Sequence, residues 1–324
     1  MADTKKQRIF MTGASGYVGS RITEFAVAQG YEVYGLTRSD SSAEKLKKIG
    51  GVPVRGDLTD LDVLRRESAA ADIVMHLADP FTFDLSQGYD PVIKAQAAIA
   101  DAFADSLKGT NKPLVTTSGT LMAQADPNGG ETDETAPYAQ QALVPRHLVE
   151  QYDQSLAKKG VKVSTIRLAQ WVYGRGGSGV KIFLEMSAKR GEVLCVDEGK
   201  NYISTVHVDD AARLFLLAAQ KAPAGSIYNA TDSTDVKFRQ IADAMAEILH
   251  LPVKSLTLEE SVAQLGPFFG RFLAANNRAS SAKAKKELGW EIREKQGIVE
   301  EIRSGSYVAL AKELLSNPGA GAAH

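Results

Sequence analysis

The chain has 324 residues, of which 44% are hydrophobic and 24% charged, a composition that suits one large or two closely joined globular domains. Lys and Arg number 38 and Asp and Glu 39, so a net charge of −1 provides no basic excess for nucleic acid. No apolar run reaches the roughly 18 residues of a membrane-spanning helix. Cys195 is the only cysteine, and the apolar stretch at 8–12 is too short for a signal-peptide core. We therefore expect a soluble, cytoplasmic protein without nucleic-acid or membrane partners.

Short apolar runs alternate with helical patterns through the first half of the chain. Strands are expected at 8–12, 32–37, 52–55, 73–77, 114–117 and 163–168. Helices are expected at 90–107, 145–158, 183–189, 210–220 and 238–249. Continuous apolar strands that alternate with helices predict an α/β fold, a doubly wound parallel sheet of the Rossmann type, with a smaller C-terminal substrate-binding part.

The alternation loosens after the glycine-rich segment 174–179, which is the expected crossing between two parts of the chain. Residues 1–175 are predicted to form a dinucleotide-binding Rossmann domain. Residues 176–316 are predicted to be mainly substrate-binding, with some return to the Rossmann core. The segment 317–324 is expected to be a flexible tail.

A glycine-rich loop follows the first predicted strand, with glycines at 13, 16 and 19. The first permits a tight turn, the second a close approach of backbone to a pyrophosphate, and the third close packing of the following helix on the sheet. Free N–H groups at the start of that helix then face the phosphates. The residues predicted to bind the dinucleotide here are Gly13, Ser15, Gly16, Tyr17, Val18 and Gly19.

The end of the second predicted strand favours NADP(H) over NAD(H). An NAD-binding chain usually places a carboxylate there to hold the ribose hydroxyls. This chain has Arg38, whose guanidinium can pair with a 2′-phosphate, and the nearest carboxylate is Asp40, two residues later. The alternative is that Arg38 is an ordinary solvated side chain.

Further segments follow in a fixed order, and together they carry a family resemblance. They are Gly56-Asp57-Leu58, His76-Leu77-Ala78, Thr117-Ser118-Gly119-Thr120, the segment 167–174, the segment 206–211 and the segment 286–290. With the glycine loop, they make nearly the whole chain resemble the extended short-chain dehydrogenase/reductase family, close to its NAD-dependent epimerase/dehydratase group. The resemblance implies a monomer or homodimer. It also implies that cofactor contacts are made by Asp57, Leu58, Leu77, Ala78 and Thr117, and that Ser118 is catalytic.

The chain departs from this family at the catalytic pair. The family couples a Tyr to a Lys four residues later, on a helix that carries a Glu four residues beyond the Lys. Counting back from Glu150 places Arg146 at the Lys position and Ala142 at the Tyr position. Arg146 can hold ribose hydroxyls and supply positive charge, but a guanidinium does not give up its proton. Ala142 has no acid group, and Pro145 leaves it on or beside a loop.

The proton donor must then come from elsewhere, and the candidate catalytic residues are Ser118, Tyr138 and Arg146. Ser118 can orient a carbonyl oxygen, although a buried strand-end hydroxyl is the ordinary alternative. Tyr138 precedes Ala142 by four residues, and its ordinary alternative is a half-buried loop side chain. The histidines at 76, 147 and 207 are expected to be structural, and no His, Asp and Glu cluster has metal-ligand spacing.

The reaction pocket is expected at the carboxyl ends of the strands. Its predicted rim is Thr117, Ser118, Tyr138 and 169–173, and loops near 79–90, 120–140 and 262–278 are expected to shape it. Its apolar walls are predicted from Phe81, Phe83, Phe268 and Phe269.

The leading hypothesis is an NADP(H)-dependent oxidoreductase that acts on a carbonyl or alcohol of a small organic molecule. Two alternatives stay open. One is a redox-neutral epimerase or dehydratase, in which the cofactor is oxidised and regenerated in place. The other is a non-catalytic NADP(H)-binding sensor or regulator.

Overall fold

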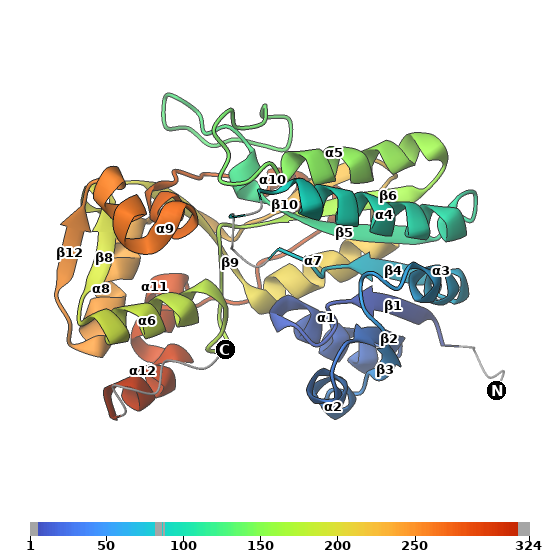
Figure 1. Ribbon diagram of the computed structural model, residues 1–324, viewed down its shortest axis with the longest axis horizontal. Helices are drawn as coiled ribbons and strands as arrows, with labels where there is room; N and C mark the ends of the chain where they lie inside the picture. Colours follow the sequence, from blue (N-terminus) through green and yellow to red (C-terminus); the bar gives the residue numbers. More distant parts are fainter. Residues whose placement is uncertain (1–5, 82–85, 87, 317–324) are drawn as a thin grey trace.

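The computed structural model describes residues 6–81, 86 and 88–316, so the predicted tail and Phe83 lie outside the described residues (Figure 1). Its centre is a seven-stranded parallel sheet of order β10-β6-β5-β4-β1-β2-β3. The strands are β1 (Arg8–Thr12), β2 (Glu32–Thr37), β3 (Val52–Arg55), β4 (Ile73–His76), β5 (Pro113–Gly119), β6 (Lys162–Leu168) and β10 (Ser226–Ala230). The predicted doubly wound α/β fold is confirmed.

The apolar strands are buried because helices cover both faces of the sheet. Along β1, Ile9 and Met11 point into one hydrophobic core and Phe10 into the opposite one, as the two-residue period of a strand requires. One covering layer contains α1 (Tyr17–Ala28), α2 (Asp40–Lys48), α7 (Val208–Lys221) and α10 (Ala282–Leu288). The other contains α3 (Leu61–Ala70), α4 (Asp90–Leu107) and α5 (His147–Ser155). In Figure 1, α4 and α5 lie in the upper part of the view and α1, α2 and α7 lie below them.

The C-terminal part packs around a third apolar core that contains Trp171, Phe183, Phe238 and Tyr307. Its strands form a three-stranded sheet, β11-β9-β7, and a two-stranded sheet, β12-β8. These strands are β7 (Trp171–Tyr173), β8 (Val193–Val196), β9 (Tyr202–His207), β11 (Ser233–Lys237) and β12 (Val253–Leu256). Its helices are α6 (Ser178–Arg190), α8 (Phe238–Leu249), α9 (Leu258–Ala274), α11 (Ile298–Ser304) and α12 (Tyr307–Ser316).

The chain returns from this part to the Rossmann layers through α7 and β10. Helix α7 packs on α1, and β10 becomes the strand beside β6 at one end of the large sheet. The chain therefore crosses between the two parts more than once, and no single residue boundary separates them.

Helix α9 differs from the sequence prediction, which placed 262–278 in a pocket-forming loop. A capping box between Thr257 and Glu260 starts the helix, and the chain kinks at Gly266, whose φ is +81°, just before Pro267. Gly and Pro inside the segment hid the helical pattern. The helix persists because its aromatic side chains, Phe269 and Phe272, pack on the third core.

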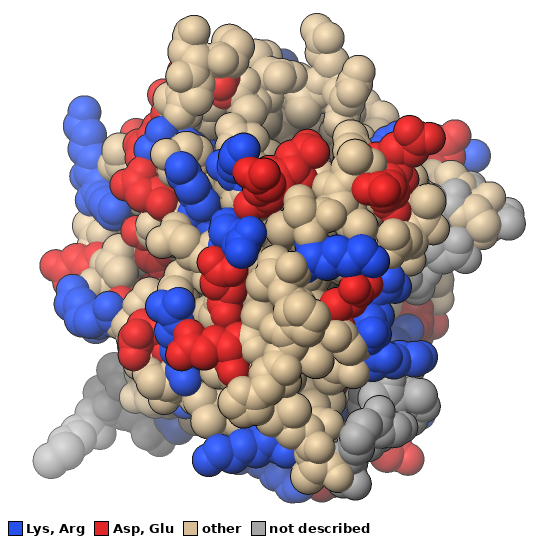
Figure 2. Space-filling view, turned by 90° about the vertical axis from the view of Figure 1, so that its left-hand side faces the viewer, with Lys and Arg blue, Asp and Glu red and all other residues tan. Residues whose placement is uncertain are grey.

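The face of the C-terminal part seen in Figure 2 carries Lys and Arg side chains interspersed with Asp and Glu. No single-sign area dominates the described residues visible there. Among the helices in the described part of the chain, none is both long enough and apolar enough to cross a bilayer.

Candidate active site

The glycine loop joins the end of β1 to the start of α1, at the edge where the strands of the large sheet end. Gly13 has φ +76°, a left-handed conformation that favours glycine, and its carbonyl accepts from the Gly16 N–H at 2.9 Å. A Cβ on Gly19 would lie 2.1 Å from that carbonyl oxygen, so glycine alone fits where helix and loop cross. No side chain caps the helix at Gly16, and its first N–H groups stay available to an anion.

Other residues predicted for this loop have different surroundings. Gly16 is exposed and Ser15 and Val18 are half-buried, whereas the Tyr17 hydroxyl donates to the Gly174 carbonyl at 2.6 Å. Burial raises the pKa of Tyr17, so its phenol keeps its proton. Tyr17 thus ties the loop to the crossing after β7.

Arg38 follows the end of β2 and is exposed, and it makes no hydrogen bond or ion pair with the described residues. Asp40, the nearest carboxylate, pairs with Arg55 at 2.9 Å. The next residue after Arg38, Ser39, caps α2 by accepting from the Ser42 N–H. At this corner Asp40 therefore has a cationic partner, whereas Arg38 has no anionic partner among the described residues.

Asp57 and Leu58 lie after β3, and the Gly56 N–H donates to the Thr37 carbonyl at 3.2 Å. The Asp57 carboxylate accepts from the Thr59 N–H at 3.1 Å, which shapes the turn locally. These residues stand near the end of β2, and their predicted contact with the adenine stays a prediction.

A buried hydrogen-bond chain joins the ends of β1 and β4. The Thr12 hydroxyl lies 2.7 Å from His76 Nδ1, and His76 Nε2 lies 2.7 Å from Gln96 Oε1. Thr12 also accepts from the N–H groups of Leu77 (carbonyl, 3.2 Å) and Ala78 (hydroxyl, 3.3 Å). Burial lowers the pKa of His76 to about 4, so the imidazole is neutral and structural at neutral pH.

This burial predicts an acid sensitivity. The folded-state pKa of about 4 lies below the ordinary value of 6.5, so the unfolded chain binds the extra proton and stability is lost as pH falls from 6.5 towards 4. Between pH 7 and pH 5 we expect His76 to contribute a loss of about 2 kcal/mol. Urea unfolding of wild type and His76→Gln at both pH values measures it, and parallel losses in the two proteins would contradict it.

Arg146, at the family's Lys position, is held at the start of α5 by three neighbours. Its Nη1 forms an ion pair with Asp79 and lies 3.5 Å from the Tyr89 hydroxyl, and its Nη2 donates to the Thr117 carbonyl at 2.8 Å. Burial lowers the pKa of Arg146, but a guanidinium remains charged at neutral pH. The site therefore has a fixed cation where strands β4 and β5 end.

An apolar cavity lies beside Arg146, and neither of the predicted proton donors, Ser118 and Tyr138, lines it. The Ser118 hydroxyl is buried and lies 3.4 Å from Met122 Sδ. The Tyr138 hydroxyl donates to Glu150 at 3.0 Å, and Glu150 forms a buried ion pair with Arg167 at 2.6 Å. The Thr117 hydroxyl donates to the His76 carbonyl at 2.9 Å. Thr117, Ser118 and Tyr138 were expected at the rim of the pocket, and none of them is among the residues that line this cavity.

The cavity itself has a volume of about 300 Å³ and lies against the ends of β5 and β6. Ala142 and Arg146 both line it, and 142 lies in a loop as expected. Its wall is mainly apolar and aromatic, formed by Phe81, Tyr89, Leu121, Met122, Leu143, Val144, Leu168, Ala169, Val172, Phe268 and Phe272. Its polar lining groups include Asp79, Thr120 and Gln170.

We call this the inner cavity. A larger outer cavity of about 690 Å³ adjoins it, and the two share Leu121, Ala142 and Leu143. Of the aromatic residues predicted for the walls, Phe81 and Phe268 line the inner cavity and Phe269 packs in the third core.

The sequence reasoning missed Asp79 and Tyr89. Asp79 directly follows His76-Leu77-Ala78, and Tyr89 directly precedes the helix predicted at 90–107. Asp79 could have been found because it follows a buried strand, and Tyr89 because it precedes a helix. Both positions lie at the sheet edge where ligands bind.

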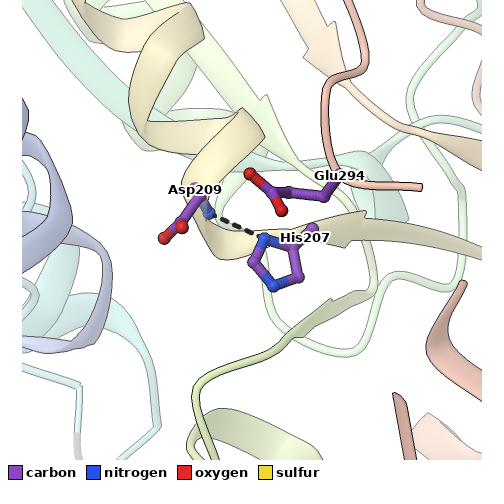
Figure 3. A group of neighbouring side chains, drawn as sticks. All are labelled: His207, Asp209 and Glu294. Atoms are coloured by element: carbon purple, nitrogen blue, oxygen red, sulfur yellow. Dashed lines mark hydrogen bonds between the residues drawn. The ribbon is translucent and has the colours of Figure 1, made fainter. Parts of the chain in front are cut away.

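A His, Asp and Glu group also comes together in the fold (Figure 3). One ligand atom each of His207, Asp209 and Glu294 lies within 4.8 Å of the others. Figure 3 shows the backbone N–H of Asp209 donating to His207 Nδ1. Arg175 pairs with Asp209 and Arg213 with Glu294, so two guanidinium groups already balance the carboxylates. We interpret these three residues and the two arginines as a network of charged side chains at the start of α7.

Comparison with known proteins places this chain in a family. The model of the NAD dependent epimerase/dehydratase family matches residues 9–231. The chain is 36% identical over 285 residues to an uncharacterized protein of Schizosaccharomyces pombe, covering 88% of this chain and 94% of the relative. It is 24% identical over 313 residues to the 4-hydroxy-2-methyl-3-oxo-4-farnesyl-3,4-dihydroquinoline-1-oxide ketoreductase of Stigmatella aurantiaca, covering 87% and 91%.

A solved structure supports the same fold. The UDP-glucose 4-epimerase of Thermotoga maritima, crystallised with UDP-glucose, superposes with a TM-score of 0.73 at 21% identity, covering 95% of this chain and 100% of that one. The chain belongs to the NAD dependent epimerase/dehydratase family. Its relatives with a stated activity include reductases, a dehydrogenase and an epimerase. The predicted family resemblance is confirmed.

Proposed function

We propose that this protein is an NADP(H)-dependent oxidoreductase that interconverts a carbonyl and an alcohol on a small organic molecule. The observation that carries the proposal is the inner cavity, which lies at the strand ends and includes the fixed cation Arg146. Its mainly apolar, aromatic wall suits a substrate with an apolar body. Its few polar groups suit one orienting contact at the carbonyl.

The residues at the strand ends fit a dinucleotide. The uncapped N-terminus of α1 offers N–H groups to a pyrophosphate, and the glycine crossing at Gly13 and Gly19 leaves no room for side chains there. When bound, NADP(H) supplies the hydride donor or acceptor. The residues that would hold it are those of the loop, Arg38, Asp57, Leu58, Leu77, Ala78, Thr117 and Arg146.

Arg38 carries the preference for NADP(H) within this proposal. Arg38→Glu should weaken NADPH binding by about 1.5–3 kcal/mol, roughly 10- to 100-fold, because a charged hydrogen bond to the 2′-phosphate is lost. NADH, which lacks that phosphate, should bind nearly as before. Calorimetric titration of both cofactors measures the difference. Arg303→Glu, the same charge change on α11, serves as the control, and equal losses for NADPH and NADH would count against the role.

Arg146 would serve the reaction through its charge and its fixed place. Asp79 and the Thr117 carbonyl hold the guanidinium, so it needs no reorganisation to face a ribose hydroxyl or a developing negative charge on the carbonyl oxygen. It retains its protons, so it cannot be the acid. Ser118→Ala and Tyr138→Phe test the two donors expected from the sequence.

The proposal is tested by following NADPH absorbance with a panel of apolar ketones and aldehydes. Net consumption with at least one carbonyl compound is the expected result. Retained cofactor and altered substrate without net consumption would instead indicate epimerase or dehydratase chemistry.

One observation favours a second candidate function, a non-catalytic NADP(H)-binding protein. Ala142 stands in the inner cavity at the family's Tyr position and has no proton to donate. Tight NADPH binding without any turnover would support this candidate and contradict the oxidoreductase.

A further inference from the structure

We propose that Tyr89 is the catalytic acid of this site and takes the place of the family's missing Tyr. The inference rests on the proposed carbonyl reduction. Tyr89 precedes α4, is 5% exposed and lines the inner cavity. Its ring packs edge-on against Phe81, which also lines the cavity, with 5.3 Å between ring centroids.

The phenol oxygen accepts a hydrogen bond from a cation, and the phenol's own proton is not donated to any of the described residues. Arg146 Nη1 lies 3.5 Å away and donates to that oxygen. The Tyr89 O–H has no acceptor among the described residues, so its proton is available to an acceptor in the cavity. The charged groups that face the phenol are Arg146 and, through it, Asp79.

The other hydroxyl groups near Arg146 are engaged elsewhere. Tyr138 donates to Glu150, which belongs to the buried pair with Arg167. Thr120 lines the cavity but donates to Asn277 Oδ1 at 2.7 Å. Ser118 lies against Met122 Sδ. Among these groups Tyr89 alone combines a cavity position with an uncommitted proton.

The reaction step balances with Tyr89 as acid. Bound NADPH would supply the hydride that the carbonyl carbon gains, so the π-electron pair of the C=O bond would move to oxygen and that oxygen would take the phenolic proton. The products would be the alcohol, the oxidised cofactor and a Tyr89 phenolate beside Arg146, which water would then reprotonate. The guanidinium stabilises the phenolate through its fixed charge.

The protonation state agrees with this direction of the reaction. Burial raises the pKa of Tyr89 to about 12, so at neutral pH the phenol carries its proton and can donate it. An alkoxide is a stronger base than a phenolate, so the transfer runs downhill. Oxidation of the alcohol, which needs the phenolate as base, should be the slower direction near neutral pH.

The test compares Tyr89→Phe with wild type on a carbonyl compound that wild type reduces. Tyr89→Phe keeps the ring and its contact with Phe81, and we expect kcat to fall by about 10²–10⁴-fold while the Kd for NADPH stays within about twofold. The matched control is Tyr152→Phe, whose hydroxyl binds Asp101 at 2.7 Å away from the cavity, and it should keep full activity. Unchanged kcat in Tyr89→Phe, or a large loss in Tyr138→Phe or Ser118→Ala instead, would overturn the proposal.

A second readout needs no turnover. In protein with isotope-labelled tyrosine, the ring resonance missing from the spectrum of Tyr89→Phe belongs to Tyr89. Benzamide, an unreactive carbonyl probe, should shift that resonance in the NADPH-bound protein, and the shift should saturate. If benzamide does not shift the Tyr89 resonance, the role of Tyr89 is overturned. If the shift saturates but the protein reduces no carbonyl compound, the contact is upheld and the proposed function is contradicted.

Discussion

Glu150→Ala is expected to lower the free energy of unfolding by about 3–5 kcal/mol, because it leaves the Arg167 guanidinium buried without its partner. Glu150 and Arg167 have side-chain exposures of 0% and 2%, and two nitrogens of Arg167 reach the carboxylate at 2.6 and 3.0 Å. The Tyr138 hydroxyl loses its acceptor in the same change. Urea unfolding followed by circular dichroism measures the loss.

Two variants separate burial from charge. Asp243→Ala breaks the exposed pair between Arg239 and Asp243 on α8 and should cost no more than about 1 kcal/mol. The double change Glu150→Leu with Arg167→Met removes both buried charges and should recover most of the loss. If the double variant is as unstable as Glu150→Ala, an unpaired buried charge is not the cause.

Gly19→Ala is expected to damage both the fold and cofactor binding. The added Cβ would stand 2.1 Å from the Gly13 carbonyl oxygen, so α1 or the loop must move, at a cost of about 1–3 kcal/mol. The displaced N–H groups would then no longer reach the pyrophosphate. Each charged hydrogen bond that is lost should lower the affinity for NADPH by about tenfold or more. Thermal unfolding without cofactor and titration with NADPH measure the two effects separately.

Gly16→Ala is the matched change in the same loop. Its Cβ would meet only the Gly13 carbonyl oxygen, at 3.1 Å, and its φ of −76° accepts any residue. The apo protein should therefore unfold nearly as wild type does, while NADPH binding falls because the methyl group occupies the space that the pyrophosphate approaches. Equal NADPH affinity in Gly16→Ala and wild type would mean that this loop does not hold the phosphates.

The departure at 142 and 146 changes how the site has to work. The family pairs a proton donor with a cation on neighbouring turns of one helix. Here Arg146 supplies a cation at the family's Lys position, whereas Ala142, at the Tyr position, has no acidic group. Both residues line the inner cavity. In the proposal above, Tyr89, which directly precedes α4, supplies the donor from a different element.

The local sequence determined the strands, most helices and the glycine loop. Alternating burial along β1 and the glycines at 13, 16 and 19 depend on neighbours within a few residues, so their patterns are legible in one chain. The predicted segments 8–12, 32–37, 52–55, 90–107 and 238–249 coincide with β1, β2, β3, α4 and α8. Helix α9 was missed because Gly266 and Pro267 break its local pattern while packing on the third core preserves it.

Only the tertiary structure decided which polar side chains reach the cavity. The count back from Glu150 located Arg146, but its partners Asp79, Tyr89 and Thr117 come from segments 29 to 67 residues away in the chain. The Tyr138 hydroxyl donates to Glu150, and the Ser118 hydroxyl lies against Met122 Sδ. Residue spacing in the sequence does not predict either contact. A buried hydroxyl turns to whichever partner packing places within hydrogen-bond distance, and that partner is set by the crossing of distant strands and helices.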